Sequence, residues 1–173
     1  MPRLAVSSSP QEWENSGRTL FQNKRYFQAM HCFERAGLTR EVAVSHTYYL
    51  REQARAIPST GTKQNITARQ SAFLIAAEAF LQCCDAASNT KEKKAYLRAA
   101  GDCFERAQED NKAADSYARA EEYNAAVKLY RKCAKFDEAV AIVLNHRPKV
   151  DVDIADNIVD VARLFYFKGG ELE

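Results

Sequence analysis

The sequence predicts an all-α fold of about nine antiparallel helices. Residues that favour helices (Ala, Glu, Lys, Arg, Leu and Gln) dominate most of the chain. Glycine and proline, which punctuate tight turns, number only 6 and 4 among the 173 residues, so few β-turns are expected. Apolar residues recur at helical spacing, and no segment alternates apolar and polar residues over the length of a strand.

The helices can be placed from their start and stop signals. Ser9 suits an N-cap and Pro10 a first helical turn, so residues 1–9 form a predicted flexible lead-in. Gly37 suits a helix end, because glycine adopts a positive φ easily. The predicted helices cover residues 11–23, 26–36, 39–56, 67–87, 91–108, 111–120, 123–134, 137–145 and 152–168.

Residues 10–173 are expected to form one helical-repeat domain. Its predicted parts are the first helices at 10–56, an internal loop with Pro58 and Gly61 at 57–66, middle and short-helix repeats at 67–147, and the start of a further repeat at 148–173. A last helix with Leu164, Phe165 and Phe167 exposed would lack the polar cap that stacked repeats need for solubility. The chain is therefore expected to be a piece of a longer protein, unless this helix folds back as its own cap.

Two sets of residues share the spacing of a helix-turn-helix unit of about 34 residues. In the first unit, we expect Trp13 to fill the space between helices and Gly17 to let them meet closely. The first set is Trp13, Gly17, Tyr26, Ala29, Phe33 and Ala36. The second set begins 84 positions later and is Leu97, Gly101, Phe104, Ala113, Tyr117 and Ala120.

A second pattern, which we call the short repeat, overlaps the second set. Its alanines, Ala113, Ala126 and Ala139, are evenly spaced at 13 positions, and Tyr117, Tyr130 or Val143 stands four positions after each. One short helix and a tight turn repeated in this way would build a continuous antiparallel stack. This pattern is also seen in SNAP-like and clathrin-repeat solenoids.

The first set resembles the W…L-G…Y…A…F…A pattern of the TPR superfamily, with Ser16 in place of the usual Leu. The resemblance implies a right-handed α–α superhelix, a TPR-like solenoid. Residues 13–37, together with Tyr49 to Arg55, more closely resemble the TPR region of large TPR-and-ankyrin-repeat-containing proteins. In that family the region accompanies a helicase-like P-loop NTPase domain, which this chain does not contain.

The resemblance also implies a partner-binding groove lined by the first helix of each unit. Its mixed charge and amide groups would suit an extended or helical peptide. Glu14 stands where a Lys of the family's carboxylate clamp would be expected, which argues against that specialised role. The residues assigned to the groove are Gln11, Glu14, Asn15, Arg18, Phe21, Gln22, Arg98, Asp102, Glu105 and Arg106.

No catalytic, cofactor or metal site is predicted. The glycines lack a P-loop context, and neither H-E-x-x-H nor paired C-x-x-C occurs. The neighbours Cys83 and Cys84 point about 100° apart on a helix, so they cannot grip one ion without other ligands. No signal peptide is recognised, and free thiols are expected on apolar helix faces. Both observations favour an intracellular protein, cytoplasmic or nuclear.

The expected partner is a protein, a peptide or another domain of the parent chain. The leading hypothesis is a non-catalytic scaffold module, and the short repeat supports a SNAP-like trafficking adaptor as the alternative. Helical-repeat binding to RNA is a third hypothesis, although a net charge of +2 predicts no large basic face for a phosphate backbone, so nucleic acid is not the expected partner. The most apolar stretch, Phe73 to Cys84, is too short to span a bilayer.

Overall fold

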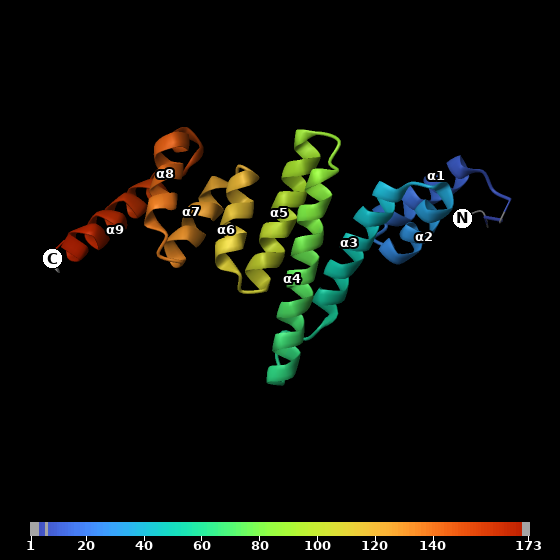
Figure 1. Cartoon of the computed structure of the whole chain (residues 1–173), viewed down its shortest axis with the longest axis horizontal. Coiled ribbons are helices and arrows are strands. Elements are labelled where there is room, and N and C mark those ends of the chain that lie inside the picture. Colours follow the sequence, from blue (N-terminus) through green and yellow to red (C-terminus); the bar gives the residue numbers. More distant parts are fainter. Residues whose placement is uncertain (1–3, 6, 171–173) are drawn as a thin grey trace. The chain divides into compact units, whose positions relative to one another are not determined.

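The computed structural model describes residues 4–5 and 7–170, and in them the chain is all-α with nine α-helices. Residues 1–3 and 6 of the predicted lead-in, and residues 171–173 of the predicted last repeat, lie outside this part. The chain divides into two compact units, residues 1–87 and 88–173. Figure 1 labels the helices of each unit. Within each unit, helices that follow one another in sequence pack against one another.

The described part of unit 1 contains four helices. The Oγ of Ser9 accepts a hydrogen bond from the amide of Glu12 at 3.2 Å, as its predicted capping role requires. The Oγ1 of Thr62 caps the fourth helix in the same way, so this helix begins four residues before the predicted Thr67 and the loop covers only residues 57–62. The helices are α1 (Pro10–Gln22), α2 (Tyr26–Ala36), α3 (Thr39–Ala56) and α4 (Lys63–Asp85).

Unit 2 begins with a long helix and continues with three short ones. The Oδ1 of Asn89 accepts from the amide of Glu92 at 2.8 Å and so caps the first. Its helices are α5 (Thr90–Arg106), α6 (Asp110–Arg119), α7 (Tyr123–Lys132), α8 (Phe136–His146) and α9 (Val152–Gly170), with the 3₁₀ turn η1 (Arg147–Lys149) before α9. Tertiary packing must stabilise the short helices, because about ten residues form only a marginal helix in isolation.

Both units pack a glycine of their first helix against an aromatic ring of their second. A Cβ placed on Gly17 would lie 2.8 Å from Cε1 of Phe33, and one on Gly101 would lie 2.9 Å from Cε1 of Tyr117. The interval along the chain from glycine to ring is the same in both pairs. The close approach predicted for Gly17 is therefore confirmed, and the second set has the same register.

Five tight turns between described helices have one hydrogen-bond pattern. A residue with positive φ donates its amide to the carbonyl three residues earlier, and the next amide bonds five residues back, which is the Schellman motif. The residues with positive φ at these turns are Lys24, Gly37, Gln108, Glu121 and Ala134. Within each unit, neighbouring members of this set are 13 positions apart, so the short repeat is a repeat of helix plus turn.

The small and aromatic repeat residues lie largely in the core. Ala113, Ala126 and Ala139 are completely buried, as their spacing predicts. Trp13 is partly buried and packs against the cluster around Leu20 of α1 and Phe33 of α2, as expected for a residue between these helices. The guanidinium of Arg35 lies 5.7 Å from the centre of the Trp13 ring and covers part of it.

Candidate functional site

The predicted groove residues on α1 mostly bond to one another. The Nε2 of Gln11 donates to the Oδ1 of Asn15 at 3.0 Å, and Arg18 forms a 2.6 Å ion pair with Glu14. Gln22 is exposed. Phe21 packs edge-on against Tyr26 and Tyr48, with ring centres 5.0 and 5.1 Å away. Phe21 is therefore part of the packing of unit 1, and the polar members other than Gln22 pair with one another.

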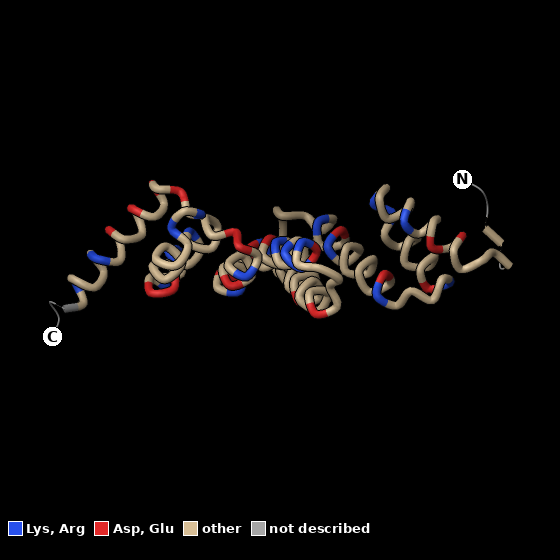
Figure 2. The backbone as a smooth tube through the Cα atoms, turned by 90° about the horizontal axis from the view of Figure 1, so that it is seen from above, with Lys and Arg blue, Asp and Glu red and all other residues tan. Residues whose placement is uncertain are grey.

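The predicted residues on α5 lie in unit 2 and are also paired. Arg98 lies 3.4 Å from Glu122, and Arg106 lies 3.1 Å from Asp102. The hydroxyl of Tyr117 donates to Glu105 at 3.3 Å. Figure 2 shows acidic and basic residues interspersed along the helices of both units. The structure thus brings together the members of each set, one on α1 and one on α5.

A groove runs between α3 and α4 of unit 1, and we call it the α3–α4 groove. One end has a volume of about 160 Å³, and the other, more open end about 450 Å³. His46, Ala79 and Gln82 line both ends. The narrow end is completed by Arg40, Ala43, Val44, Thr47, Cys83 and Ala86. The open end is completed by Leu50, Leu74, Ile75 and Glu78.

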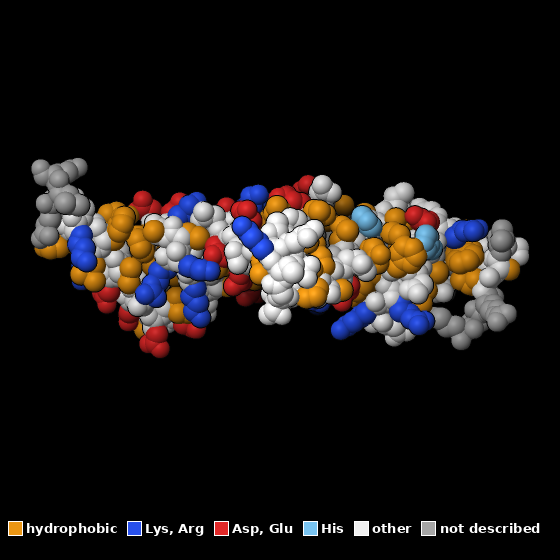
Figure 3. Space-filling view, turned by 90° about the horizontal axis from the view of Figure 1, so that it is seen from below, with side chains coloured by type: hydrophobic (Ala, Val, Ile, Leu, Met, Phe, Trp, Pro, Cys, Tyr) orange, Lys and Arg blue, Asp and Glu red, His pale blue; other side chains and the backbone are white. Residues whose placement is uncertain are grey.

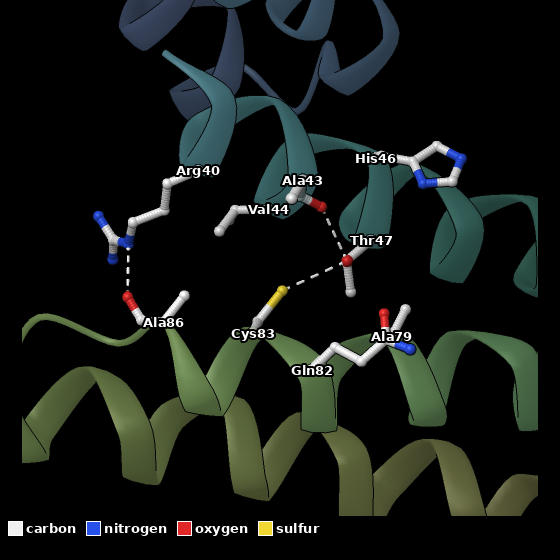
Figure 4. Close-up of a pocket in the computed structure, with 9 residues that line it drawn as sticks. All are labelled: Arg40, Ala43, Val44, His46, Thr47, Ala79, Gln82, Cys83 and Ala86. Atoms are coloured by element: carbon white, nitrogen blue, oxygen red, sulfur yellow. Dashed lines mark hydrogen bonds between the residues drawn. The ribbon is translucent and has the colours of Figure 1, made fainter.

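Hydrogen bonds close the narrow end of the α3–α4 groove (Figure 4). The Nε of Arg40 donates to the carbonyl of Ala86 at 2.9 Å and so joins the start of α3 to the end of α4. Thr47 donates to the carbonyl of Ala43, and its oxygen lies 3.4 Å from the Sγ of Cys83. Cys83 points from α4 towards Thr47, so its thiol takes part in packing between the helices.

Arg69 fixes the turn at the opposite end of the α3–α4 pair. Its guanidinium donates to the carbonyl of Ile57 at 2.7 Å and approaches those of Ala54 and Arg55 at 3.4 Å. These carbonyls belong to the end of α3, where a positive charge also complements the helix dipole. The same guanidinium lies 4.8 Å from the ring centre of Phe73, which is completely buried. The two walls of the groove are therefore held at both ends.

The open end of the α3–α4 groove presents apolar surface. Ile75 is 57% exposed, although it belongs to the most apolar stretch of the chain. Residues 73–77 are all apolar, and five consecutive residues surround a whole helix. While Phe73, Ala76 and Ala77 are buried, Ile75 must face outwards. Figure 3 shows hydrophobic side chains gathered close to histidines on this face of unit 1.

The sequence prediction missed this groove because it assigned binding to α1 and α5. The available signal was the all-round apolar character of residues 73–77, which exceeds what one buried helix face requires. Phe27 adds to the exposed apolar surface of unit 1, since it is 47% exposed and packs against His31 and Tyr49.

Unit 2 contains a hollow of about 300 Å³ between α7 and α9, which we call the α7–α9 hollow. Its lining consists of Val127, Lys128, Arg131, Asp153, Ile154, Asn157 and Ile158. The three residues from α7 stand 84 positions after Ala43, Val44 and Thr47, which line the α3–α4 groove. The third helix of each unit thus contributes the same repeat positions to the lining of a hollow.

Two contacts hold the helices around the α7–α9 hollow. The backbone amide of Asp151 donates to the Oδ1 of Asn124 at 2.9 Å, which joins the start of α9 to α7. The rings of Tyr123 and His146 stack with centres 4.2 Å apart and join the start of α7 to the end of α8. Ile158 and Val127 form an almost completely buried floor.

Burial and carboxylates change the titration of several groups in unit 2. Burial raises the pKa of Tyr117, and nearby Glu105 and Asp102 raise it further. Burial likewise raises the pKa of Tyr130, together with its hydrogen bond to Asp115. The pKa of Lys132 is raised by its hydrogen bond to Asp110, 2.7 Å away.

Among residues 4–5 and 7–170, no three or more His, Cys, Asp or Glu side chains are grouped so that they could hold a metal ion. No helix in that part of the chain is long and apolar enough to cross a bilayer. Comparison of the chain with protein-family models, curated proteins and solved structures found no match.

Proposed function

We propose that this chain is a non-catalytic protein-interaction module whose α3–α4 groove receives an amphipathic helix of a partner protein. The observation that carries the proposal is the exposure of Ile75 beside Leu50 and Leu74 at the open end of the groove. An apolar surface between two helices is where a partner helix buries its own apolar face.

The dimensions of the α3–α4 groove suit a short helix. On α3 the lining extends from Arg40 to Leu50, which at 1.5 Å per residue is roughly 15 Å, or nearly three helical turns. Leu50 and Ile75 would bury the partner's apolar side chains at the open end. His46 and Gln82, which are exposed, would offer hydrogen bonds along the middle.

The repeat architecture supports a scaffold role for the chain. Each helix buries its apolar face largely against its neighbours in the sequence, which is how solenoid proteins create extended binding surfaces. We therefore propose a right-handed, TPR-like superhelix that serves an intracellular parent protein. By its resemblance to the TPR-and-ankyrin-repeat-containing proteins, that parent would carry a helicase-like NTPase domain, and the module would position partners for it.

The experiment is a selection of peptides from a displayed random library on the whole chain, followed by binding measurements on variants. Selected peptides should have apolar residues at i, i+3 and i+4 and gain helicity when they bind. Ile75→Glu should weaken their binding at least about tenfold, because it places a charge in the apolar end of the groove.

Leu144→Glu provides the matched control, because Leu144 is also an exposed apolar residue, at 72%, but lies on α8. Binding by this variant should stay within about twofold of the original affinity. Selected peptides that bind the Ile75→Glu variant with undiminished affinity would refute the groove assignment.

The short repeat favours a second candidate, a SNAP-like trafficking adaptor. Three successive helices of unit 2 follow this repeat with the same turn geometry. Such an adaptor should co-sediment with coiled-coil bundles or with liposomes. Absence of the chain from both pellets would end this candidate and leave the peptide-binding proposal standing.

A further inference from the structure

We propose that the α7–α9 hollow of unit 2 is a second binding site, which takes an acidic protein segment carrying one large apolar side chain. This inference goes beyond the groove of unit 1, because it concerns other helices and a different ligand chemistry. Its grounds are the shape of the hollow, the charge on its rim and its place in the repeat.

The hollow combines an apolar floor with a charged rim. Ile158 and Val127 are 0% and 1% exposed at its base, and Ile154 is partly buried beside them. Lys128 and Arg131 stand on the α7 side, and both side chains are exposed. A volume of about 300 Å³ accommodates a side chain of the size of leucine or phenylalanine, which the floor would remove from water.

The positively charged rim of the hollow favours a ligand that carries carboxylates. Helix α7 contains Lys128, Arg131 and Lys132 and no acidic residue. Lys132 is already paired with Asp110, whereas Lys128 and Arg131 form no ion pair with any residue of the described chain. Two cations three residues apart lie on one helix face, where they can pair with successive carboxylates of a bound segment.

Comparison with unit 1 separates the shape of the site from its chemistry. The repeat positions that carry Lys128 and Arg131 carry Val44 and Thr47 in unit 1, where they line the narrow end of the α3–α4 groove. These repeat positions therefore line a hollow in both units, whereas the two cations are particular to unit 2. Unit 1 has the more apolar site and unit 2 the more basic one.

Asp153 restricts the ligand to a segment that is not uniformly negative. It lies on the α9 side of the hollow, so the charged lining sums to a single positive charge. A nucleic acid, whose phosphates repeat along the whole strand, would be repelled by this carboxylate and would leave the apolar floor unfilled. A peptide that alternates carboxylates and apolar side chains satisfies Lys128, Arg131 and the floor together.

The test uses methyl NMR of the whole chain labelled at isoleucine δ1. The chain has six isoleucines, so each site has its own reporter: Ile154 and Ile158 for the hollow, and Ile75 for the α3–α4 groove. The probe is a peptide of alternating glutamate and leucine. Its addition should shift Ile154 and Ile158, and a Lys128→Glu/Arg131→Glu variant should weaken that response at least about tenfold.

A Lys91→Glu/Arg119→Glu variant has the same change in net charge on unit 2 at exposed residues outside the hollow. It should bind the probe within about twofold of the original chain. Equal weakening by both variants would overturn the proposal, as would unmoved Ile154 and Ile158 at millimolar probe. A larger shift of these methyls by a uridine oligonucleotide than by the peptide would also overturn it. Ile75 reports separately on the groove, so either site can fail alone.

Discussion

The two units begin alike and then diverge. Gly17 and Phe33 of unit 1 correspond to Gly101 and Tyr117 of unit 2, and the first turns both have a positive φ of 61° at the equivalent position. After this point α3 and α4 extend to 18 and 23 residues, whereas α7 and α8 have 10 and 11.

This difference shows how one helix-turn unit gives two kinds of site. Long α3 and α4 form two walls that meet only partly, and their open end is apolar. Short α8 lets α9 pack against α7 as well, so the site of unit 2 forms between helices that are not consecutive. The lengths of the helices that follow the shared glycine–aromatic pair therefore decide which helix forms the second wall of the site: α4 in unit 1 and α9 in unit 2.

The largest expected effect concerns the glycine shared by both units. Gly17→Leu and Gly101→Leu should each lower the free energy of unfolding by about 3 kcal/mol, because a side chain would collide with the ring of Phe33 or Tyr117. Even Gly17→Ala should destabilise the protein, although alanine is more favourable than glycine in a helix by about 1 kcal/mol. Chemical denaturation measures these changes.

Gly169→Ala is the control, because a Cβ there meets no atom within 4 Å. This variant should be as stable as the original chain or slightly more so. An unaltered unfolding curve for Gly101→Leu would contradict the register that we assign to unit 2.

Alkaline pH should affect the tyrosines that unit 2 has in its repeat. The folded pKa values of Tyr117 and Tyr130 are raised above the unfolded value of about 10. The contribution of these protonated tyrosines to the free energy of unfolding is therefore complete below about pH 10 and falls progressively as the pH rises towards their folded pKa values. Between pH 10 and 11 the loss should be about 1 kcal/mol or less per tyrosine, since both are partly screened by solvent.

Denaturation of the Tyr117→Phe/Tyr130→Phe variant at several pH values provides the comparison. Its stability should decline less between pH 10 and 11, as phenylalanine does not titrate and already occupies the place of Tyr117 in unit 1, at Phe33. Parallel pH profiles for the two proteins would show that these hydroxyls do not cause the decline.

The turns offer a reciprocal pair of substitutions. Gly37→Ala should destabilise unit 1 by about 1 kcal/mol, and Ala134→Gly should stabilise unit 2 by a similar amount, because both residues have positive φ. Thermal unfolding followed by circular dichroism should show midpoints moving in opposite directions. If the midpoints of both variants moved in the same direction, the turn geometry would not determine the stability of these positions.

The smallest expected effect tests an incompletely satisfied position in unit 1. Ser45 is completely buried and its hydroxyl has no hydrogen-bond partner in the described chain, whereas unit 2 has Leu129 at this position. Ser45→Ala should raise the free energy of unfolding by about 0.5 to 1 kcal/mol in denaturation experiments. Thr47→Val should lower it, since the Thr47 hydroxyl donates to Ala43. A loss of stability in Ser45→Ala would contradict this account.

Most of the fold could be predicted because its signals are local. Ser9 and Gly37 mark helix ends, and the spacing of Gly17, Ala29 and Phe33 sets the packing of the first pair. The prediction places the start of α4 four residues late, because it misses the capping role of Thr62. Division into two units depends on contacts distant in sequence, which no local pattern reports.

The candidate sites were harder to predict, because they depend on which faces remain uncovered. The family resemblance assigns Phe21 to a groove, and in the structure this partly buried ring also packs edge-on against Tyr26 and Tyr48, which lie on later helices. The exposure of Ile75 follows from the burial of its neighbours, which an apolar stretch alone does not reveal. The proposed role of Lys128 and Arg131 depends on α9, which lies beside α7 although the whole of α8 separates the two in sequence.

The turn geometry of unit 2 sets a rule for insertions and deletions. Each helix with its turn makes up one short repeat, and the next helix runs in the opposite direction. Loss of one such segment would reverse the direction of every helix after it, whereas loss of two would restore it. Changes in length that preserve this architecture are therefore expected in steps of about 26 residues.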